Sequence, residues 1–358
     1  DVALLQYTGG TTGTPKGAVL THRNLIANAT QGRAWVPGLK DGEETILAVL
    51  PLFHAYGLTL CLTFAVYIGA CLVLLPRFEP DQVIAAVRRR PPTFLPGVPP
   101  LYERLVDAAE ASGADLTSIK FAISGAMSLP EHIVERWERA TGGLLVEGYG
   151  MTETSPVTVG NPVAPTRRPG TVGVPFPSTR VRIVDPDDPT RERKQGEPGE
   201  LLVNGPQVFS GYWKRPDETA AVLLPGGWIR TGDVAVMDSD GFITIVDRIK
   251  ELIITGGFNV YPSEVEDALR EHPDIQDAAV IGLPARTSGE HVAAAVVPVD
   301  GAVLDPEMVR NWCRDRLAGY KIPRRIAVVD ELPRSQIGKV MRRSVRDHLI
   351  TQEPIDRS

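Results

Sequence analysis

The sequence predicts an α/β protein in which a mostly parallel sheet is layered with helices, followed by a small β-rich subdomain and an α+β C-terminal domain. Up to residue 150, apolar runs of strand length alternate with runs of helix length, which is the rhythm of βαβ units. From Gly170 the chain has short strands between Gly and Pro turns, and beyond Arg248 strands and helices mix in a compact module. We therefore assign residues 1–247 to part of a large N-terminal domain, with 169–247 as its β-rich subdomain, and 248–358 to a C-terminal domain.

The first elements follow from their local patterns. The apolar run 2–7 predicts a buried strand, and a second strand is expected at 18–20. Thr21 is a suitable N-cap for a helix that runs from Arg23 toward Trp35 and ends before a Pro-Gly pair. Further strands of the sheet are expected at 45–50, 71–75, 93–95, 121–124 and 144–149, and further helices at 58–67, 81–89, 99–112 and 130–141.

The later elements are shorter. Strands of the β-rich subdomain are expected at 179–185, 199–204 and 241–245. The C-terminal domain is expected to contain strands at 251–255, 277–282, 292–298 and 326–330, with helices at 263–271 and 305–317. Basic residues crowd between 310 and 346, which indicates either a solvated basic face or a docking surface for an anionic cosubstrate.

Composition and charge are those of an ordinary globular protein of the cytoplasm. The net charge of −6 provides no general field for a polyanion, which argues against nucleic acid as a partner. No apolar run approaches the roughly 18–20 residues of a membrane span, and the first residues show no basic n-region with a cleavage site, so secretion is not expected. The cysteines Cys61, Cys71 and Cys313 lack metal spacing, so buried thiols in a reducing compartment are expected.

A Gly- and Thr-rich loop between the first two strands carries the strongest chemical signal. Glycine lets backbone N–H groups approach an anion closely, threonine hydroxyls donate hydrogen bonds, and a lysine adds charge, a combination suited to a polyphosphate. Gly17 follows the lysine, so the loop is not a Walker motif. By itself the pattern also fits a flexible hairpin tip. The candidate phosphate-binding residues are Thr8, Gly9, Gly10, Thr11, Thr12, Gly13, Thr14 and Lys16.

The whole string 7–17, together with 20–24, resembles the signature loop of the adenylate-forming superfamily, and the sequence is most similar to bacterial long-chain fatty acid–CoA ligases. This resemblance implies two steps: ATP and a fatty acid give acyl-AMP, and coenzyme A then takes the acyl group as a thioester. It also implies Mg²⁺, held by Thr8 and Glu153, and a mobile C-terminal domain.

Further strings match the superfamily in its own order within the N-terminal part. By resemblance, His54 closes the acyl pocket, although an isolated histidine beside an apolar run is also typical of a core residue. Gly125 and Ala126 resemble the segment between the acyl group and adenine. The string Gly148, Tyr149, Gly150, Met151, Thr152 and Glu153 resembles the segment in which tyrosine stacks on adenine, threonine contacts the α-phosphate and glutamate binds the metal. It stands at a strand end, where open α/β sheets bind ligands.

The remaining matches lie around and beyond the predicted domain boundary. Asp233 and Arg248 match the ribose contacts of the superfamily, and Lys250 matches its hinge. Gly256 and Gly257 resemble the loop of the pantetheine tunnel in acyl-CoA synthetases. Lys339 resembles the catalytic lysine of adenylation, whose role is to neutralise charge that develops at the α-phosphate.

Two other interpretations remain open. A fatty acyl-AMP ligase would stop at the adenylate, but such ligases resemble this family with an insertion near the domain boundary, and 232–248 is short and regular. The chain also begins without methionine and enters a strand at once, so we expect a part of a longer protein, inactive alone, or a truncated remnant. The resemblance further leaves room for peripheral contact at the inner face of the cell membrane. Oligomeric state and acyl chain length do not follow from the sequence.

Overall fold

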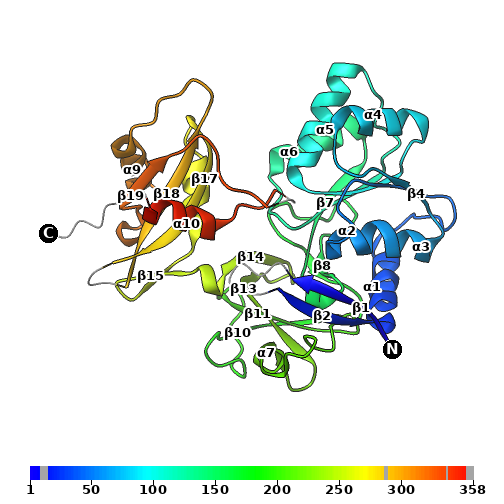
Figure 1. Cartoon of the computed structure of the whole chain (residues 1–358), viewed down its shortest axis with the longest axis horizontal. Helices are drawn as coiled ribbons and strands as arrows, with labels where there is room; N and C mark the ends of the chain where they lie inside the picture. Colours follow the sequence, from blue (N-terminus) through cyan, green and yellow to red (C-terminus); the bar gives the residue numbers. More distant parts are fainter. Residues whose placement is uncertain (9–14, 286–288, 336–337, 352–358) are drawn as a thin grey trace. The chain divides into compact units, whose positions relative to one another are not determined.

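The computed structural model of the chain describes residues 1–8, 15–285, 289–335 and 338–351 (Figure 1). It divides into two compact units. The first comprises 1–231 and 235–245, and the second comprises 232–234 and 246–358. Each unit is described by itself below.

A seven-stranded sheet forms the centre of the first unit, in the order β4-β3-β5-β6-β7-β8-β9. The strands β4, β3, β5, β6 and β7 are parallel, β8 pairs antiparallel with β7, and β9 pairs antiparallel with β8. Their bounds are β3 Thr45–Ala48, β4 Cys71–Leu74, β5 Phe94–Gly97, β6 Phe121–Ser124, β7 Leu144–Gly150, β8 Val157–Gly160 and β9 Val174–Pro175. The predicted α/β class with a mostly parallel sheet is confirmed.

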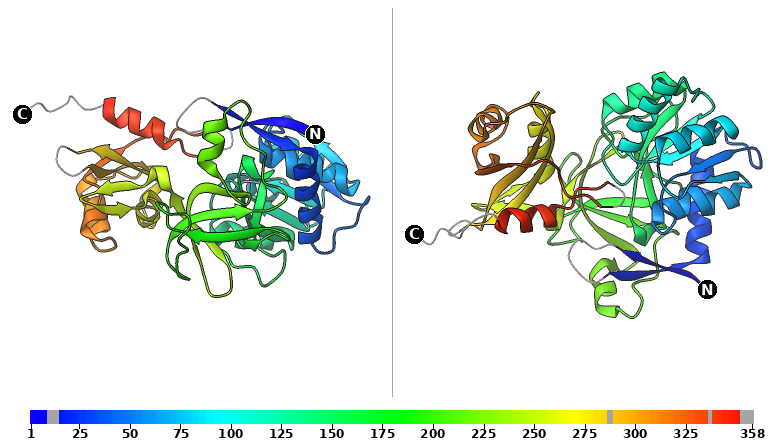
Figure 2. Two further views of the ribbon diagram at one scale, coloured as in Figure 1. Left: turned by 90° about the horizontal axis from the view of Figure 1, so that it is seen from below. Right: turned by 45° about the horizontal axis from the view of Figure 1, so that its top comes forward.

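Helices cover both faces of this sheet. Successive strand residues point to opposite sides, so each buried strand supplies apolar side chains to both faces. Leu47, Leu95 and Leu145 pack with α4, α5 and α6, whereas Ile46 and Phe94 pack with the segment from α1 to α3 (Figures 1 and 2). The helices are α1 His22–Trp35, α2 Ala55–Gly57, α3 Phe64–Ile68, α4 Pro80–Arg89, α5 Pro99–Ser112 and α6 Glu131–Thr141. Thr21 caps α1 in a capping box with Asn24, as predicted. The helix predicted at 58–67 instead begins with a π-helix, Leu58–Thr63.

The first unit also holds a second sheet and a hairpin. The sheet has the order β10-β11-β13-β12, with β14 paired to β13. Its elements are β10 Arg180–Val184, β11 Gly199–Asn204, α7 Pro216–Val222, β12 Leu223–Leu224, β13 Trp228–Met237 and β14 Ile243–Arg248, the last two of which run on into residues of the second unit. The hairpin joins β1 (Val2–Thr8) and β2 (Lys16–Thr21) in antiparallel pairing.

The run 2–7 is a strand, but the expectation that it is buried is wrong. Val2 is 51% exposed and Tyr7 is 60% exposed, and Gln6 is the buried member of the run. A two-stranded hairpin can cover only one of its faces, so an apolar run there need not mark a core strand. The expectation of buried thiols holds for Cys61 and Cys313, whereas Cys71 is half-buried.

The second unit is a three-stranded sheet with helices on both faces. The order is β17-β18-β19, with bounds Ile275–Pro284, Glu290–Pro298 and Arg325–Val328. Helices α8 (Pro262–Arg270) and α9 (Pro306–Arg314) pack with Val280 and Val296 on one face, and α10 (Arg342–Thr351) packs with Ile281 on the other (Figure 1). A small hairpin of β15 (Ile253–Thr255) and β16 (Phe258–Val260) precedes α8. Short 3-10 helices lie at Thr152–Thr154, Ile249–Glu251 and Gly319–Lys321.

Two expectations for this unit need correction. The helix predicted at 305–317 ends at Arg314, and the backbone N–H groups of Arg316 and Leu317 both turn back to the carbonyl of Cys313. Helix α10 was not predicted, because its cluster of basic residues was interpreted as a charged surface. Within the described residues, we find no helix with the length and apolar character needed to cross a membrane.

Candidate active site

The first unit positions the base of the predicted phosphate loop on a hairpin. Thr8 ends β1 and lies opposite Lys16, the first residue of β2. The residues between them that were assigned to phosphate binding, Gly9, Gly10, Thr11, Thr12, Gly13 and Thr14, lie outside the described residues. The structure therefore locates the two ends of the loop, each on a paired strand.

Glu153 is buried at the carboxyl end of β7. The strand ends at Gly150, where a Cβ atom would lie 1.9 Å from the carbonyl oxygen of Pro156, so glycine alone fits there. The chain then forms the 3-10 helix that contains Thr152 and Glu153. Glu153 is 7% exposed, and its carbonyl accepts a hydrogen bond of 2.8 Å from the Phe209 N–H. Its carboxylate Oε1 accepts a hydrogen bond of 2.6 Å from the Tyr212 hydroxyl.

Tyr212 brings two of the predicted residues together, although the sequence reasoning did not select it. In addition to its bond with Glu153, its ring lies under the ammonium group of Lys16, with Nζ 5.0 Å from the ring centroid. The available signal was an aromatic residue directly after Gly211 in an otherwise apolar run, which is weak. Tyr149 lies elsewhere in the same unit and packs, half-buried, against the apolar core that contains Leu20 and Val159.

His54 and the pair Gly125 and Ala126 are linked through the buried ring of Tyr56. A Cβ atom on Gly125 would lie 3.2 Å from that ring, and Ala126 has a positive φ of 66°. The Tyr56 hydroxyl donates to the carbonyls of Ile123 (2.5 Å) and Gly97 (3.1 Å). His54 accepts at Nδ1 from the Tyr56 N–H at 3.2 Å, and burial lowers the pKa of the imidazole. A neutral imidazole with the proton on Nε2 follows.

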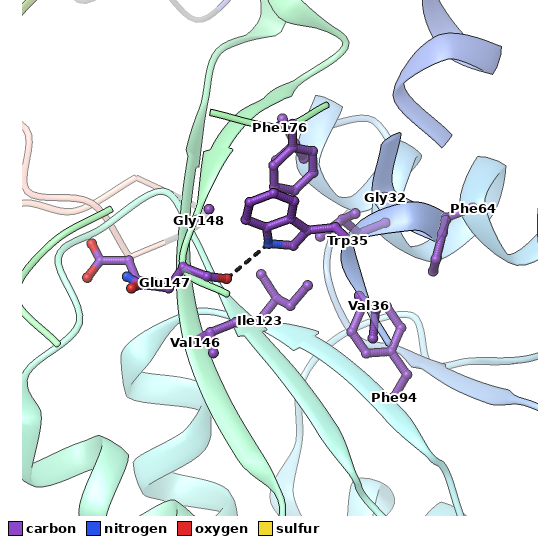
Figure 3. A pocket seen from close by; sticks show the side chains of 14 residues that line it. Gly32, Trp35, Val36, Phe64, Phe94, Ile123, Val146, Glu147, Gly148 and Phe176 are labelled. Carbon is purple, nitrogen blue, oxygen red and sulfur yellow. Dashed lines mark hydrogen bonds between the residues drawn. The ribbon is translucent and has the colours of Figure 1, made fainter. Parts of the chain in front are cut away.

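An apolar cavity lies beside these residues, between α1, the π-helix and the central sheet (Figure 3). Its accessible lining is apolar, and the cavity is partly open to solvent. The stacked rings of Trp35 and Phe176, with centroids 4.5 Å apart, form one wall. The indole Nε1–H of Trp35 donates to the carbonyl of Asn161 at 3.0 Å, which fixes the ring. Gly148 on β7 also lines the cavity.

Glu147, which the sequence reasoning did not select, precedes Gly148 on β7. Its carboxylate points away from the cavity in Figure 3 and accepts a hydrogen bond of 3.3 Å from the Leu129 N–H. Burial raises the pKa of this carboxyl to about 8, against an ordinary value near 4.5. The group therefore carries a proton at neutral pH, which removes the cost of burying its charge.

The second unit brings Asp233 and Arg248 together. The Arg248 guanidinium donates from Nε to Asp233 Oδ1 at 3.1 Å, and Asp233 is almost fully buried. Lys250 follows in the 3-10 helix Ile249–Glu251. Asp233 and Arg248 are 15 residues apart in the sequence, and they meet because β13 pairs with β14.

Lys339 stands in a tight turn that is closed by its own backbone. Ser335 and Lys339 exchange hydrogen bonds: the Ser335 N–H donates to the Lys339 carbonyl at 2.8 Å, and the Lys339 N–H donates to Ser335 Oγ at 3.2 Å. Arg334 and Val340 form a bridge at the base of the turn, and Gly338 takes a φ of 82°. The backbone position of Lys339 is thus set by residues within five positions of it.

Burial lowers the pKa of Lys339 to about 8, and repulsion from Arg248 adds to the effect. The carboxylates of Glu251 and Asp233 act in the opposite direction. The lysine is therefore balanced between its charged and neutral forms in the neutral to mildly alkaline range.

Arg342, the first residue of α10, connects the Lys339 turn to the rest of the unit. Its guanidinium donates to Glu266 at 2.9 and 2.7 Å, contacts Glu251, and lies 3.6 Å from Asp247. Asp247 in turn accepts from the Ser263 N–H and hydroxyl, both at 2.8 Å. One cation therefore ties α10 to β14, to the 3-10 helix and to α8.

Gly256 and Gly257 form the turn between β15 and β16. Their φ values are 56° and 82°, and a Cβ atom at either would meet no atom within 4 Å. The local backbone thus explains glycine at both positions through the left-handed conformation alone. Their predicted role in a pantetheine tunnel remains a prediction.

A doubly wound sheet with a glycine-rich hairpin and a buried carboxylate beyond the carboxyl end of a parallel strand defines an α/β protein of the nucleotide-binding class. The chain belongs to the AMP-binding enzyme family, which matches residues 1–213, and residues 264–339 match the C-terminal domain of AMP-binding enzymes. The resemblance to adenylate-forming enzymes is confirmed.

Relatives agree with this assignment. The chain is 45% identical over 343 residues to a long-chain-fatty-acid–CoA ligase of Bacillus subtilis, covering 96% of this chain and 61% of that protein. It is 40% identical to a feruloyl-CoA synthase of Amycolatopsis sp., covering 97% and 70%. The ATP-bound crystal structure of MatB from Rhodopseudomonas palustris superposes with a TM-score of 0.89 at 35% identity, covering 97% and 68%. The chain thus spans about three fifths of the fatty acid–CoA ligase it matches.

Proposed function

We propose that the protein is an ATP-dependent fatty acid–CoA ligase. The observation that carries this proposal is the apolar cavity bounded by Trp35, Phe176 and Gly148, which lies in the same unit as the phosphate-loop hairpin and Glu153. An apolar cavity beside a polyphosphate site suits an acid with a long hydrocarbon chain. The name of the Bacillus subtilis relative supports the same substrate class.

The residues of the first unit suit ATP and Mg²⁺. Thr8, Lys16 and the loop between them would hold the phosphates, with Thr152 at the α-phosphate, while Tyr149, Gly125 and Ala126 would border the adenine. Glu153 is a buried carboxylate for which the described residues supply no ion-pair partner, and such a group is stable when it coordinates a cation. Glu153 and Thr8 would therefore hold Mg²⁺, which supplies charge neutralisation for the phosphates when bound.

The second unit carries groups suited to each half-reaction. In the first step the fatty acid carboxylate attacks the α-phosphorus of ATP, pyrophosphate leaves, and acyl-AMP forms. Asp233 and Arg248 would hold the ribose, and Lys339 would stabilise the charge that develops at the α-phosphate. In the second step the thiolate of coenzyme A attacks the acyl carbonyl and AMP leaves, with Gly256 and Gly257 beside the pantetheine arm and Lys250 as the hinge.

ATP–pyrophosphate exchange in the natural polypeptide that carries these residues tests the proposal. With saturated acids of increasing length, burial of each methylene contributes about 0.8 kcal/mol, so we expect affinity to rise about fourfold per methylene until the cavity is filled. Exchange that is equally fast with acetate would contradict the fatty acid assignment. Preference for an aromatic acid would point to the substrate class named for the Amycolatopsis relative.

Thioester formation separates the ligase from a fatty acyl-AMP ligase. We expect acyl-CoA as the final product; accumulation of acyl-AMP in the presence of coenzyme A would favour the alternative. We also propose that the protein acts in the cytoplasm and contacts the inner face of the cell membrane peripherally, because fatty acids partition into the bilayer. Co-sedimentation with lipid vesicles tests that contact.

A further inference from the structure

Tyr212 is held rigidly before any ligand binds. Its backbone pairs with Ala18 of β2, and its N–H donates to Thr219 Oγ1 at 2.9 Å. The next residue, Trp213, donates its N–H to the Gly17 carbonyl at 2.8 Å. The ring of Phe209 packs edge-on against the Tyr212 ring, with centroids 5.0 Å apart and planes at 75°. The tyrosine is therefore fixed to the strand that carries Lys16.

The Tyr212 hydroxyl acts as a permanent donor to Glu153. The bond of 2.6 Å is short, as expected for a hydroxyl that donates to a carboxylate. With Oε1 engaged in this way, the orientation of the carboxylate is set, and among the described residues no side chain bonds to Oε2, which is left for another ligand.

The face of the same ring serves the lysine. Lys16 Nζ lies 5.0 Å from the ring centroid, within the range at which the negative face of an aromatic ring attracts an ammonium group. Lys16 is the first residue of β2, and without this contact its long side chain would sample many rotamers. One side chain thus contacts both a carboxylate suited to a metal ion and a cation suited to a phosphate.

We propose that Tyr212 is a positioning residue of the metal–phosphate site, in which its hydroxyl orients Glu153 and its ring orients Lys16. This inference rests on the proposed function, because it assigns Tyr212 a role toward Mg²⁺ and ATP. The two contacts use different parts of one side chain, so two substitutions separate them.

Calorimetric titration of ATP, with and without Mg²⁺, provides a readout that does not depend on turnover. Tyr212→Phe keeps the ring and removes the hydroxyl, so we expect the Mg²⁺ concentration for half-maximal enhancement of ATP binding to rise about tenfold, with metal-free ATP binding unchanged. Tyr212→Leu removes the ring as well, and we expect metal-free ATP binding also to weaken by about threefold to tenfold.

Tyr67→Phe is the matched control, because it removes an exposed hydroxyl that contacts Thr30 on α1, and it should leave both quantities unchanged. A general loss of folding in Tyr212→Phe would appear as a lowered melting temperature without ligand, whereas a positioning role leaves that temperature close to the parent value. An unchanged Mg²⁺ requirement in Tyr212→Phe would overturn the role of Tyr212 alone. If the parent protein itself fails to bind ATP in the presence of Mg²⁺, both the proposed function and this inference are rejected.

Discussion

Replacing Arg342 with alanine should destabilise the second unit more than the removal of an exposed charge such as that of Arg314. The substitution leaves Asp247, Glu266 and Glu251 without their shared cation, and their side chains are only 2%, 6% and 17% exposed. Removing one partner from a buried ionic network costs about 3–5 kcal/mol, because the remaining charges stay desolvated. Since a domain is typically stable by about 5–15 kcal/mol, this is a large fraction of the total.

Native-state hydrogen exchange, followed by mass spectrometry on peptides from α8 and β17, measures the free energy of opening of this unit alone. Arg314→Ala on α9 is the matched control, since Arg314 is exposed and bonds to Asn311 one turn away; its loss should cost less than about 1 kcal/mol. A second variant tests the cause: adding Glu266→Gln to Arg342→Ala removes one of the three carboxylate charges that lose Arg342, and it should restore part of the stability even though Glu266 also pairs with Arg270 at 3.6 Å. Equal losses in Arg342→Ala and Arg314→Ala, or no recovery in the double variant, would refute the reasoning.

Three further predictions follow from single groups. Because the pKa of Lys339 is about 8, the protonated fraction of the lysine falls above that pH. The rate of acyl-AMP formation should decline there, while the rate of thioester formation from supplied acyl-AMP should not. A parallel decline of both rates would count against the assignment of Lys339 to the adenylation step. Glu147 has a raised pKa of about 8, so the folded state loses stability as the pH rises from the ordinary pKa of a glutamate toward 8. Glu147→Gln should therefore be more stable than the parent by roughly 2–4 kcal/mol at pH 8 and similar to it at pH 5. Urea denaturation at both pH values measures the difference. In Gly160→Val, the Cβ atom would lie 2.6 Å from the Phe176 ring and 3.1 Å from Trp35 Nε1. The affinity for a long saturated acid should therefore fall at least tenfold, while the affinity for ATP, measured as the control, stays unchanged. Unchanged acid binding would exclude this cavity as the acyl site.

Local features were the most predictable from the sequence. The capping box at Thr21 depends on residues three positions apart, and the alternation of strands and helices up to β7 depends on hydrophobic period. Wherever the determinants are neighbours in the chain, the pattern carries enough information to place the element.

Features that depend on distant partners were missed. Tyr212 meets Glu153 across 59 positions and Arg342 meets Glu266 across 76, and neither tyrosine nor arginine shows its partner in its own segment. The exposed face of β1 escaped prediction for a related reason, since burial of a strand depends on what packs against it rather than on its own apolar residues. The site residues assigned by resemblance remain predictions, and the structure adds the contacts through which several of them are linked.

The walls of the apolar cavity and the groups suited to phosphate come from almost separate parts of the sequence. Trp35 and Phe176 belong to the end of α1 and to the chain after β9, whereas Thr8, Lys16 and Glu153 lie on the hairpin and beyond β7. Under the proposed function, substitutions that reshape the acid-binding wall need not disturb nucleotide chemistry. A lineage with this architecture could therefore acquire new acids by changing a few cavity residues, and an engineer who wishes to redirect the enzyme has the same independent handle.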